Sequence, residues 1–251
     1  MKKLPLFLSS CLLSLTMVGC TSLQSTPLQP ASGKVVTSEA IIAYFAPDAG
    51  EEECACGSTM DKGYSLTPVE NGYFRKLLGR DQEGRFLLQD FYQSNGQPQT
   101  SPFWVKDPKG LNSFDGKYTD GDVIGYYDNG QIEFKEHYKD YMLQGKSELY
   151  YKNGQLNMVT EYADDVEVGE TKTYYSNGQL ASLENKLDEE HKTHKLWYST
   201  GKQAVDLIVD PYDFSILSGK AWDQQGNIIE DEDERQKVID NIYEQLDTTK
   251  N

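Results

Sequence analysis

The side chains best suited to chemistry are two cysteines and three histidines in the body of the chain. Cys54 and Cys56 are separated by one alanine and follow three glutamates. Two thiolates beside carboxylates could hold a metal ion, but they fall short of the four ligands of a structural zinc site. Outside the cytoplasm an even pair favours a disulfide, and a Cys-x-Cys loop would make it tight, strained and easily reduced. We therefore interpret Cys54 and Cys56 as a local disulfide. A redox pair and a metal site are the alternatives.

The histidines do not form a recognisable site. His191 and His194 stand three residues apart, which on a strand directs them to opposite faces, and His137 stands alone. The sequence contains none of the motifs Gly-x-Ser-x-Gly, His-Glu-x-x-His or the phosphate-binding loop. Because 40 acidic residues occur, two carboxylates that are close in sequence indicate nothing about catalysis. We therefore expect no catalytic residue, no metal, no cofactor and no enzymatic activity.

Another cysteine, Cys20, ends a motif at the start of the sequence. Two lysines precede a charge-free run, 4–18, and a small-residue cleavage site, which is the pattern of a secretory signal peptide. Residues 17–20, Met-Val-Gly-Cys, resemble a lipobox, although leucine is commoner than methionine at its first place. The resemblance implies cleavage before Cys20 and attachment of a diacylglycerol to it. Thr21, in place of aspartate, implies sorting to an outer membrane, facing the periplasm. The alternative is an ordinary secretory peptide with an incidental cysteine.

The rest of the chain is organised around a phrase, Tyr-Tyr-x-Asn-Gly-Gln-Leu/Ile, that occurs three times at intervals of 24 residues. The copies span 126–132, 150–156 and 174–180, and weaker copies begin at Trp197 and Trp222. A fixed period of this size indicates a repeat array. Asn-Gly between two β-prone runs is a strong hairpin signal, and it predicts a type I′ turn with positive φ at both residues. The turn glycines that this pattern singles out are Gly96, Gly130, Gly154, Gly178, Gly201 and Gly226.

Each repeat also has a second, polar turn, so one repeat comprises two strands and two turns. These second turns fall at 139–140, 164–165, 188–190 and 210–211. We therefore predict an all-β fold, an elongated antiparallel β-meander of hairpin repeats with a short C-terminal capping helix. A single repeat cannot offset the entropy of its ordering, so neighbours must stack. The recurrent tyrosines are interpreted as cross-strand aromatic ladders, and the alternative is an aromatic surface for a ligand.

Composition divides the chain into five parts, with strands expected at 40–45, 73–78, 85–92 and 97–105 in the N-terminal part. Apolar residues recur on one face over 232–246, which predicts a helix that caps the final hairpin, or alternatively binds a partner. The parts are a signal peptide at 1–19, a flexible tether at 20–39, an N-terminal β module with a degenerate repeat at 40–110, the repeat array at 111–229, and a C-terminal helix and tail at 230–251.

The net charge of -16 restricts the classes of partner. Such a surface repels nucleic acid and anionic lipid headgroups and favours a basic protein. The alternative is that the acidity only aids solubility.

The repeated phrase, with a glycine five residues before its first tyrosine, resembles the bacterial MORN-repeat variant of the YwqK-type antitoxin component family. The resemblance covers about residues 115–230 and implies neutralisation of a toxin. We therefore expect a monomeric, lipid-anchored binding protein of the cell envelope that binds no nucleic acid. It would act as an antitoxin or immunity protein that sequesters a basic protein through its repeat surface. The alternative is a structural scaffold or accessory lipoprotein of an envelope assembly, with no toxin partner.

Overall fold

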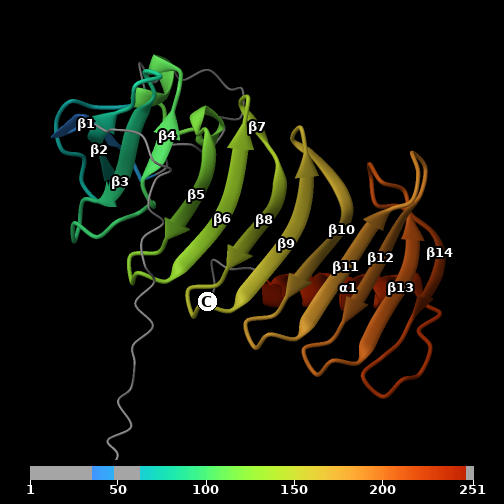
Figure 1. Ribbon diagram of the computed structural model, residues 1–251. Coiled ribbons are helices and arrows are strands. Elements are labelled where there is room, and N and C mark those ends of the chain that lie inside the picture. The colour runs from blue at the N-terminus through green and yellow to red at the C-terminus, as the bar shows by residue number, and fades with distance from the viewer. Residues whose placement is uncertain (1–35, 48–62, 247–251) are drawn as a thin grey trace, which may run out of the picture.

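The computed structural model describes residues 36–47 and 63–246, and these residues form two antiparallel sheets and one α-helix (Figure 1). The lipidation site Cys20 and the pair Cys54 and Cys56 lie outside the described residues, so their chemistry stays a prediction. The all-β meander with one C-terminal helix that the sequence predicts is confirmed.

The N-terminal sheet has four strands in the order β1-β2-β3-β4. β1 begins earlier than the sequence pattern predicts, so 36–39, which we expected within the tether, are strand and pair with β2. β4 is shorter than the expected 97–105, because Pro98 and Pro102 have no N–H to donate to a ladder. The bounds are β1 Val36–Phe45, β2 Tyr73–Arg80, β3 Phe86–Tyr92 and β4 Phe103–Val105.

The repeat array forms a ten-stranded sheet in which β5 to β14 follow one another in chain order, except that β7 pairs only at the end of β6. Its strands are β5 Gly121–Tyr126, β6 Ile132–Lys139, β7 Met142–Leu143, β8 Gly145–Tyr150, β9 Leu156–Ala163, β10 Val166–Tyr174, β11 Leu180–Lys186, β12 Lys192–Trp197, β13 Gln203–Val209 and β14 Ile216–Ala221.

Two short 3-10 helices, Pro108–Leu111 and Gly116–Tyr118, connect β4 to β5 where the two sheets meet. The sheets stay in backbone contact there, since Tyr126 N donates to Gln99 O over 2.8 Å and an isolated bridge joins Thr100 to Gly125. The array therefore continues directly from the N-terminal sheet.

The Asn-Gly turns are not the type I′ turns that we predicted. Gly130 has a φ of +82°, whereas the asparagine before it does not lie in the left-handed region. Gly130 N donates to Tyr127 O over 2.8 Å, and Tyr127 N donates to Gln131 O over 2.9 Å. This pattern is a three-residue loop that ends in a left-handed glycine. The two-residue turns with positive φ at both positions lie at the opposite edge, at Asp140-Tyr141 and Asp164-Asp165.

The second tyrosine of each copy donates its hydroxyl to a backbone carbonyl of the next copy. Tyr127 Oη donates to Tyr150 O over 2.6 Å, and Tyr151 Oη donates to Tyr174 O over 2.7 Å. The same bond extends the series at both ends, from Tyr92 to Tyr126, Tyr175 to Trp197, and Tyr198 to Trp222. The tyrosines therefore do form a ladder, but successive copies are joined by hydrogen bonds from phenol to backbone rather than by the aromatic pairs that we predicted.

The other residues of the phrase also act on the neighbouring copy. Asn129 Oδ1 accepts from Gln131 N within its own turn, over 3.0 Å, while Asn129 Nδ2 donates to Lys152 O of the next turn, over 3.0 Å. Gln131 Oε1 in turn lies against Gly154, 2.9 Å from where a Cβ would stand. Each copy is thus stabilised mainly by its neighbours, as in other one-dimensional arrays.

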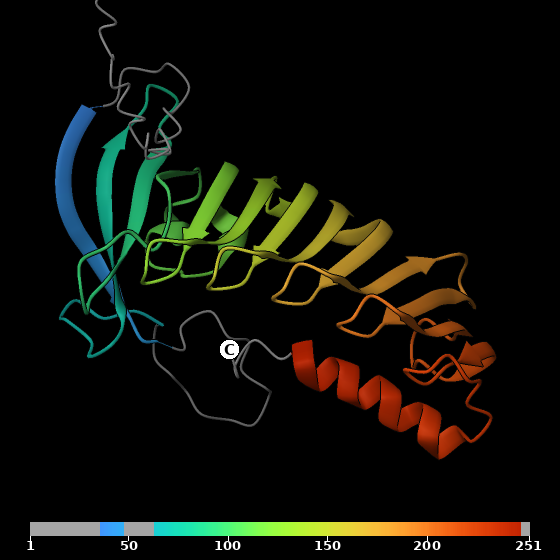
Figure 2. The same cartoon turned by 90° about the horizontal axis from the view of Figure 1, so that it is seen from below.

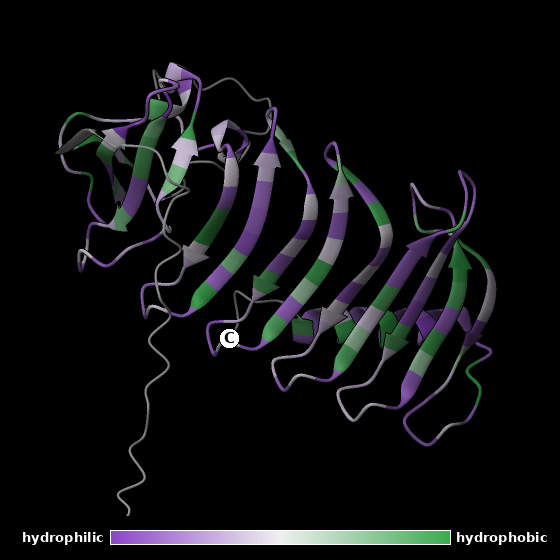
Figure 3. Ribbon diagram, in the orientation of Figure 1, coloured by the Kyte–Doolittle hydropathy of each residue, from purple (hydrophilic) through white to green (hydrophobic). Residues whose placement is uncertain are grey.

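One face of the array, which we call the inner face, is covered by α1 (Glu232–Leu246) beneath its last four strands (Figure 2). The helix bounds are those that the apolar periodicity predicts. Apolar and polar residues alternate along the strands (Figure 3), and this places Leu196, Val205 and Leu207 on the inner face. There they pack against the helix residues Ile239 and Ile242. Within the described ranges, no helix has both the length and the apolar character needed to cross a bilayer.

Candidate functional site

The two long edges of the array differ in charge. The edge opposite the Asn-Gly turns, which we call the acidic edge, comprises 139–142, 163–167, 187–191 and 210–215 and lies uppermost in Figure 1. These turns contain one lysine, Lys139. They carry eight exposed acidic residues, namely Asp140, Asp164, Asp165, Glu167, Asp188, Glu189, Glu190 and Asp213.

Exposed apolar side chains lie among these carboxylates. Tyr212 is 76% exposed and Val166 is 63% exposed, and Tyr141 and Leu187 are also more exposed than buried. Apolar side chains rimmed by polar groups mark interaction surfaces. The Asn-Gly edge differs, because its turns carry as many lysines as aspartates, and Lys152 pairs with Asp128 over 2.7 Å.

Two carboxylates of the acidic edge are held in the ionised form. The backbone N–H of Glu190 holds the pKa of Asp188 below its ordinary value, and Lys186 lowers the pKa of Glu189. Both groups therefore remain charged at neutral pH, and the edge presents a negative field to solvent.

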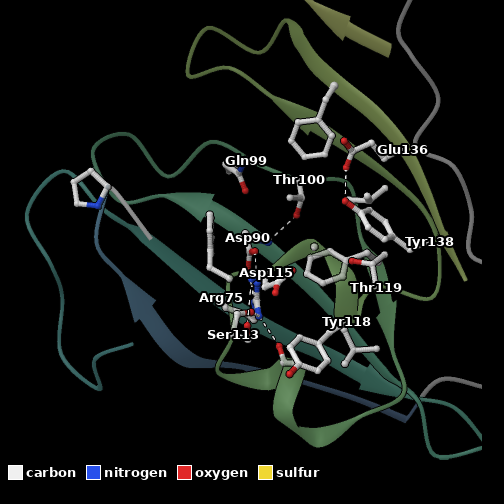
Figure 4. A pocket seen from close by; sticks show the side chains of 18 residues that line it. Arg75, Asp90, Gln99, Thr100, Ser113, Asp115, Tyr118, Thr119, Glu136 and Tyr138 are labelled. Carbon is white, nitrogen blue, oxygen red and sulfur yellow. Dashed lines mark hydrogen bonds and ion pairs between the residues drawn. The ribbon is translucent and has the colours of Figure 1, made fainter. Parts of the chain in front are cut away.

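A second candidate is a cavity of about 350 Å³ at the junction of the two sheets, which we call the junction cavity (Figure 4). Arg75 and Asp90, whose side chains are each 3% exposed, form an ion pair at its base. Arg75 Nε and Nη2 donate to the two carboxylate oxygens over 2.7 and 2.6 Å. Arg75 Nη1 donates to Gly110 O and Ser113 O over 2.6 Å each. The pair is thus internally neutral and closely hydrogen-bonded.

Two further polar side chains of the junction cavity have fewer hydrogen-bond or ion-pair partners among the described residues. Gln99 is 8% exposed, and its Oε1 is buried without a hydrogen-bond partner among the described residues. Glu136 Oε2 accepts from Tyr138 Oη over 2.8 Å, and burial raises the pKa of the Glu136 carboxyl. In the described part of the chain, no cationic side chain lies within ion-pair distance of Glu136. Among the described residues, the Gln99 oxygen therefore has no donor and the Glu136 carboxyl has no cation beside it.

The histidines lie in separate environments. His194 is buried on the inner face, where its Nε2 lies 2.9 Å from Tyr243 Oη of α1. Tyr243 also donates to Glu184 Oε1 over 3.1 Å. His191 instead contacts Asp188 in an exposed turn, over 2.8 Å. Burial lowers the pKa of His194, with Glu184 opposing this effect, so the His194 contact is a neutral link between helix and sheet.

We expect His194 to make the protein less stable as the pH falls. The unfolded chain takes up a proton near 6.5, the ordinary histidine pKa, whereas the pKa of His194 in the folded protein is lower. The unfolded state therefore binds more protons between about pH 7 and 5, and stability decreases through this interval. Urea titrations should show a smaller loss for His194→Gln than for wild type. His191→Gln is the control and should keep the wild-type dependence; equal losses in wild type and His194→Gln would contradict the assignment.

The residues singled out in the sequence are brought together only in part. All six turn glycines have positive φ; Gly96 lies between β3 and β4, and the other five lie along one edge of the array. The junction cavity was not predicted, because Arg75 and Asp90 stand 15 residues apart on different strands. The available signal was weak: Asp90 is the one charged residue of β3, but β2 carries two other basic residues besides Arg75.

Comparison with known families finds a MORN repeat variant in the array, and no curated protein matches the chain. MORN repeats are binding and structural repeats, and they are often involved in binding proteins or membranes. The tyrosine ladder extends beyond the matched segments, to Tyr92 on one side and Tyr198 on the other. The chain thus contains MORN repeats of the variant type, at residues 119–140, 143–164 and 167–185.

Proposed function

We propose that this protein is a lipid-anchored antitoxin or immunity protein of the cell envelope, which sequesters a basic protein partner on its acidic edge. The observation that carries the proposal is the combination of eight exposed acidic residues with exposed apolar side chains along one edge of a MORN-variant array. The resemblance of the phrase to the antitoxin component family supports the choice of a toxin as partner.

The two kinds of side chain have different roles in capture. The carboxylates attract a basic protein over distances comparable to the Debye length, which raises the association rate and makes it fall with salt. The apolar residues, such as Val166 and Tyr212, supply contact area that salt does not screen. A membrane surface is the other partner class of MORN repeats, but anionic headgroups would be repelled by this edge.

The anchor determines where capture takes place. Cleavage before Cys20 and lipidation of its thiol would hold the array at the outer membrane, facing the periplasm. A monomer on a tether would meet a toxin that enters the envelope before it reaches its target.

The test is a cross-linking pull-down from membranes, in which mass spectrometry identifies the captured proteins. The wild-type protein is compared with a variant whose acidic edge is charge-reversed. Glu167→Lys with Glu190→Lys removes two exposed carboxylates of the acidic edge. Glu70→Lys with Glu230→Lys makes the same charge change elsewhere on the surface. We expect the wild-type protein to recover one basic, secreted-enzyme-like protein. The amount recovered should be about tenfold lower with the edge variant and nearly unchanged with the control variant. It should also decrease at high salt.

The outcome that contradicts the proposal is recovery of resident envelope machinery, independent of salt and of the edge variant but lost in Cys20→Ala. That result would assign the protein to the structural scaffolds. Protection of cells that express the captured protein is the functional confirmation, and a captured basic protein that harms no cell would refute the antitoxin role.

A further inference from the structure

We propose that the junction cavity binds a small organic cation, an ammonium or guanidinium group on an apolar stem. The proposal concerns a cavity between the two sheets and does not depend on the acidic edge being an interface. Three features carry it: the balance of charge in the cavity, its aromatic walls, and the buried oxygen of Gln99.

The charge of the cavity favours a cation over an anion. The charged residues that line it are three acids and one arginine. Arg75 is poorly suited to receive an anion, because Asp90 neutralises its charge, and Asp90 and two backbone carbonyls occupy four of its five N–H donors. Of the remaining acids, Asp115 is partnered by Lys117 at the rim, whereas the partner of Glu136 within 36–47 and 63–246 is the hydroxyl of Tyr138. A cation beside Glu136 would compensate a carboxylate that the fold has desolvated.

The walls suit an apolar stem that carries a delocalised cation. Phe103 and Val105 of β4 and Phe134 of β6 line the cavity. The rings of this cluster already accommodate a guanidinium, since Arg75 Cζ lies 4.8 Å from the Phe45 ring centre and 5.3 Å from that of Phe103. Aromatic faces attract such cations, most strongly where water is excluded.

Gln99 supplies the independent sign of a missing ligand. It lines the cavity in Figure 4, is more than nine-tenths buried, and its Oε1 has no partner among the described residues. Native proteins rarely leave a buried acceptor unsatisfied, because its desolvation is costly. An N–H donor of a bound ligand would satisfy Gln99 Oε1, and an ammonium or guanidinium group provides such donors.

The same chemistry has two sources, a free small amine or guanidine, and a lysine or arginine side chain of a partner protein. The experiment separates them with two probes, n-butylguanidinium and the capped tripeptide Gly-Arg-Gly, titrated into the full chain by calorimetry. The control ligand is n-butylurea, which has nearly the same shape and no charge. We expect saturable one-to-one binding of n-butylguanidinium, and binding of n-butylurea at least about tenfold weaker.

Two variants test the residues, each with its fold checked by circular dichroism. Glu136→Gln keeps an acceptor for Tyr138 and removes the charge, and it should weaken binding by about tenfold or more. Gln99→Met removes the buried oxygen at similar volume and should weaken binding also. The matched control is Glu133→Gln, on the same strand, which replaces a partly buried carboxyl outside the cavity and should leave binding unchanged.

The outcomes are distinct from those of the antitoxin proposal. Binding of n-butylguanidinium but not of the tripeptide assigns the cavity to a free small cation, and binding of both assigns it to a partner's side chain. The inference is overturned if neither probe binds, if n-butylurea binds equally well, or if Glu136→Gln binds like Glu133→Gln. Charge reversal on the acidic edge should leave probe binding intact, so either proposal can fail alone.

Discussion

Replacing Asp90 with alanine is expected to lower the free energy of unfolding by about 3–5 kcal/mol. The variant leaves the guanidinium of Arg75 buried without its counter-ion, in a site where its side chain is 3% exposed. The buried charge then lacks a counter-ion, and the two carbonyls on Nη1 do not replace a carboxylate. Chemical denaturation followed by circular dichroism measures the loss.

The control for this prediction is an ion pair of similar length on the surface. Lys152 Nζ lies 2.7 Å from Asp128, and both side chains are about half exposed. Lys152→Ala should therefore change the unfolding free energy by less than about 1 kcal/mol. If Asp90→Ala were as mild as Lys152→Ala, water in the junction cavity would have to solvate Arg75 well, and the ion pair would contribute little to stability.

How easily each of these features can be predicted depends on how far apart in the sequence its interacting residues lie. Periodicity locates the repeats and the helix 232–246, because each depends on residues within a few positions of one another. Positive φ at Gly130 and Gly154 is likewise a local property of an Asn-Gly turn. By contrast, Arg75 meets Ser113 across 38 residues, and only the way β2 packs on the β4–β5 connection brings them together.

The type of turn was predicted wrongly for an informative reason. Asn-Gly is compatible with both the two-residue type I′ turn and the three-residue loop with a left-handed glycine. The same three-residue loop forms at 223–227, after which no further copy follows, so the local chain already favours it. The bond from Asn129 Nδ2 to Lys152 O, 23 residues away, adds a contact between copies to a loop of this kind.

Gly154→Val is expected to lower the free energy of unfolding by about 2–3 kcal/mol, because a β-branched residue is strained at positive φ. Gly154 has a φ of +84°, and its turn receives the side chain of Gln131 from the preceding copy. Gln131 Oε1 would stand 2.9 Å from the new Cβ, but rotation of this flexible side chain relieves most of that clash. The backbone strain therefore dominates, and chemical denaturation gives its size.

Two variants separate the strain from the contact between copies. Gly130→Val places the same side chain at a φ of +82° with no atom within 4 Å of its Cβ, so it should cost nearly as much as Gly154→Val. Gly154→Asn should cost less than Gly154→Val, because asparagine tolerates the left-handed region. If Gly154→Val unfolded like the wild type, the left-handed turn at Asn153-Gly154 would be wrong. If it cost much more than Gly130→Val, the stacking of Gln131 on Gly154 would hold neighbouring repeats together more strongly than the backbone of the turn itself.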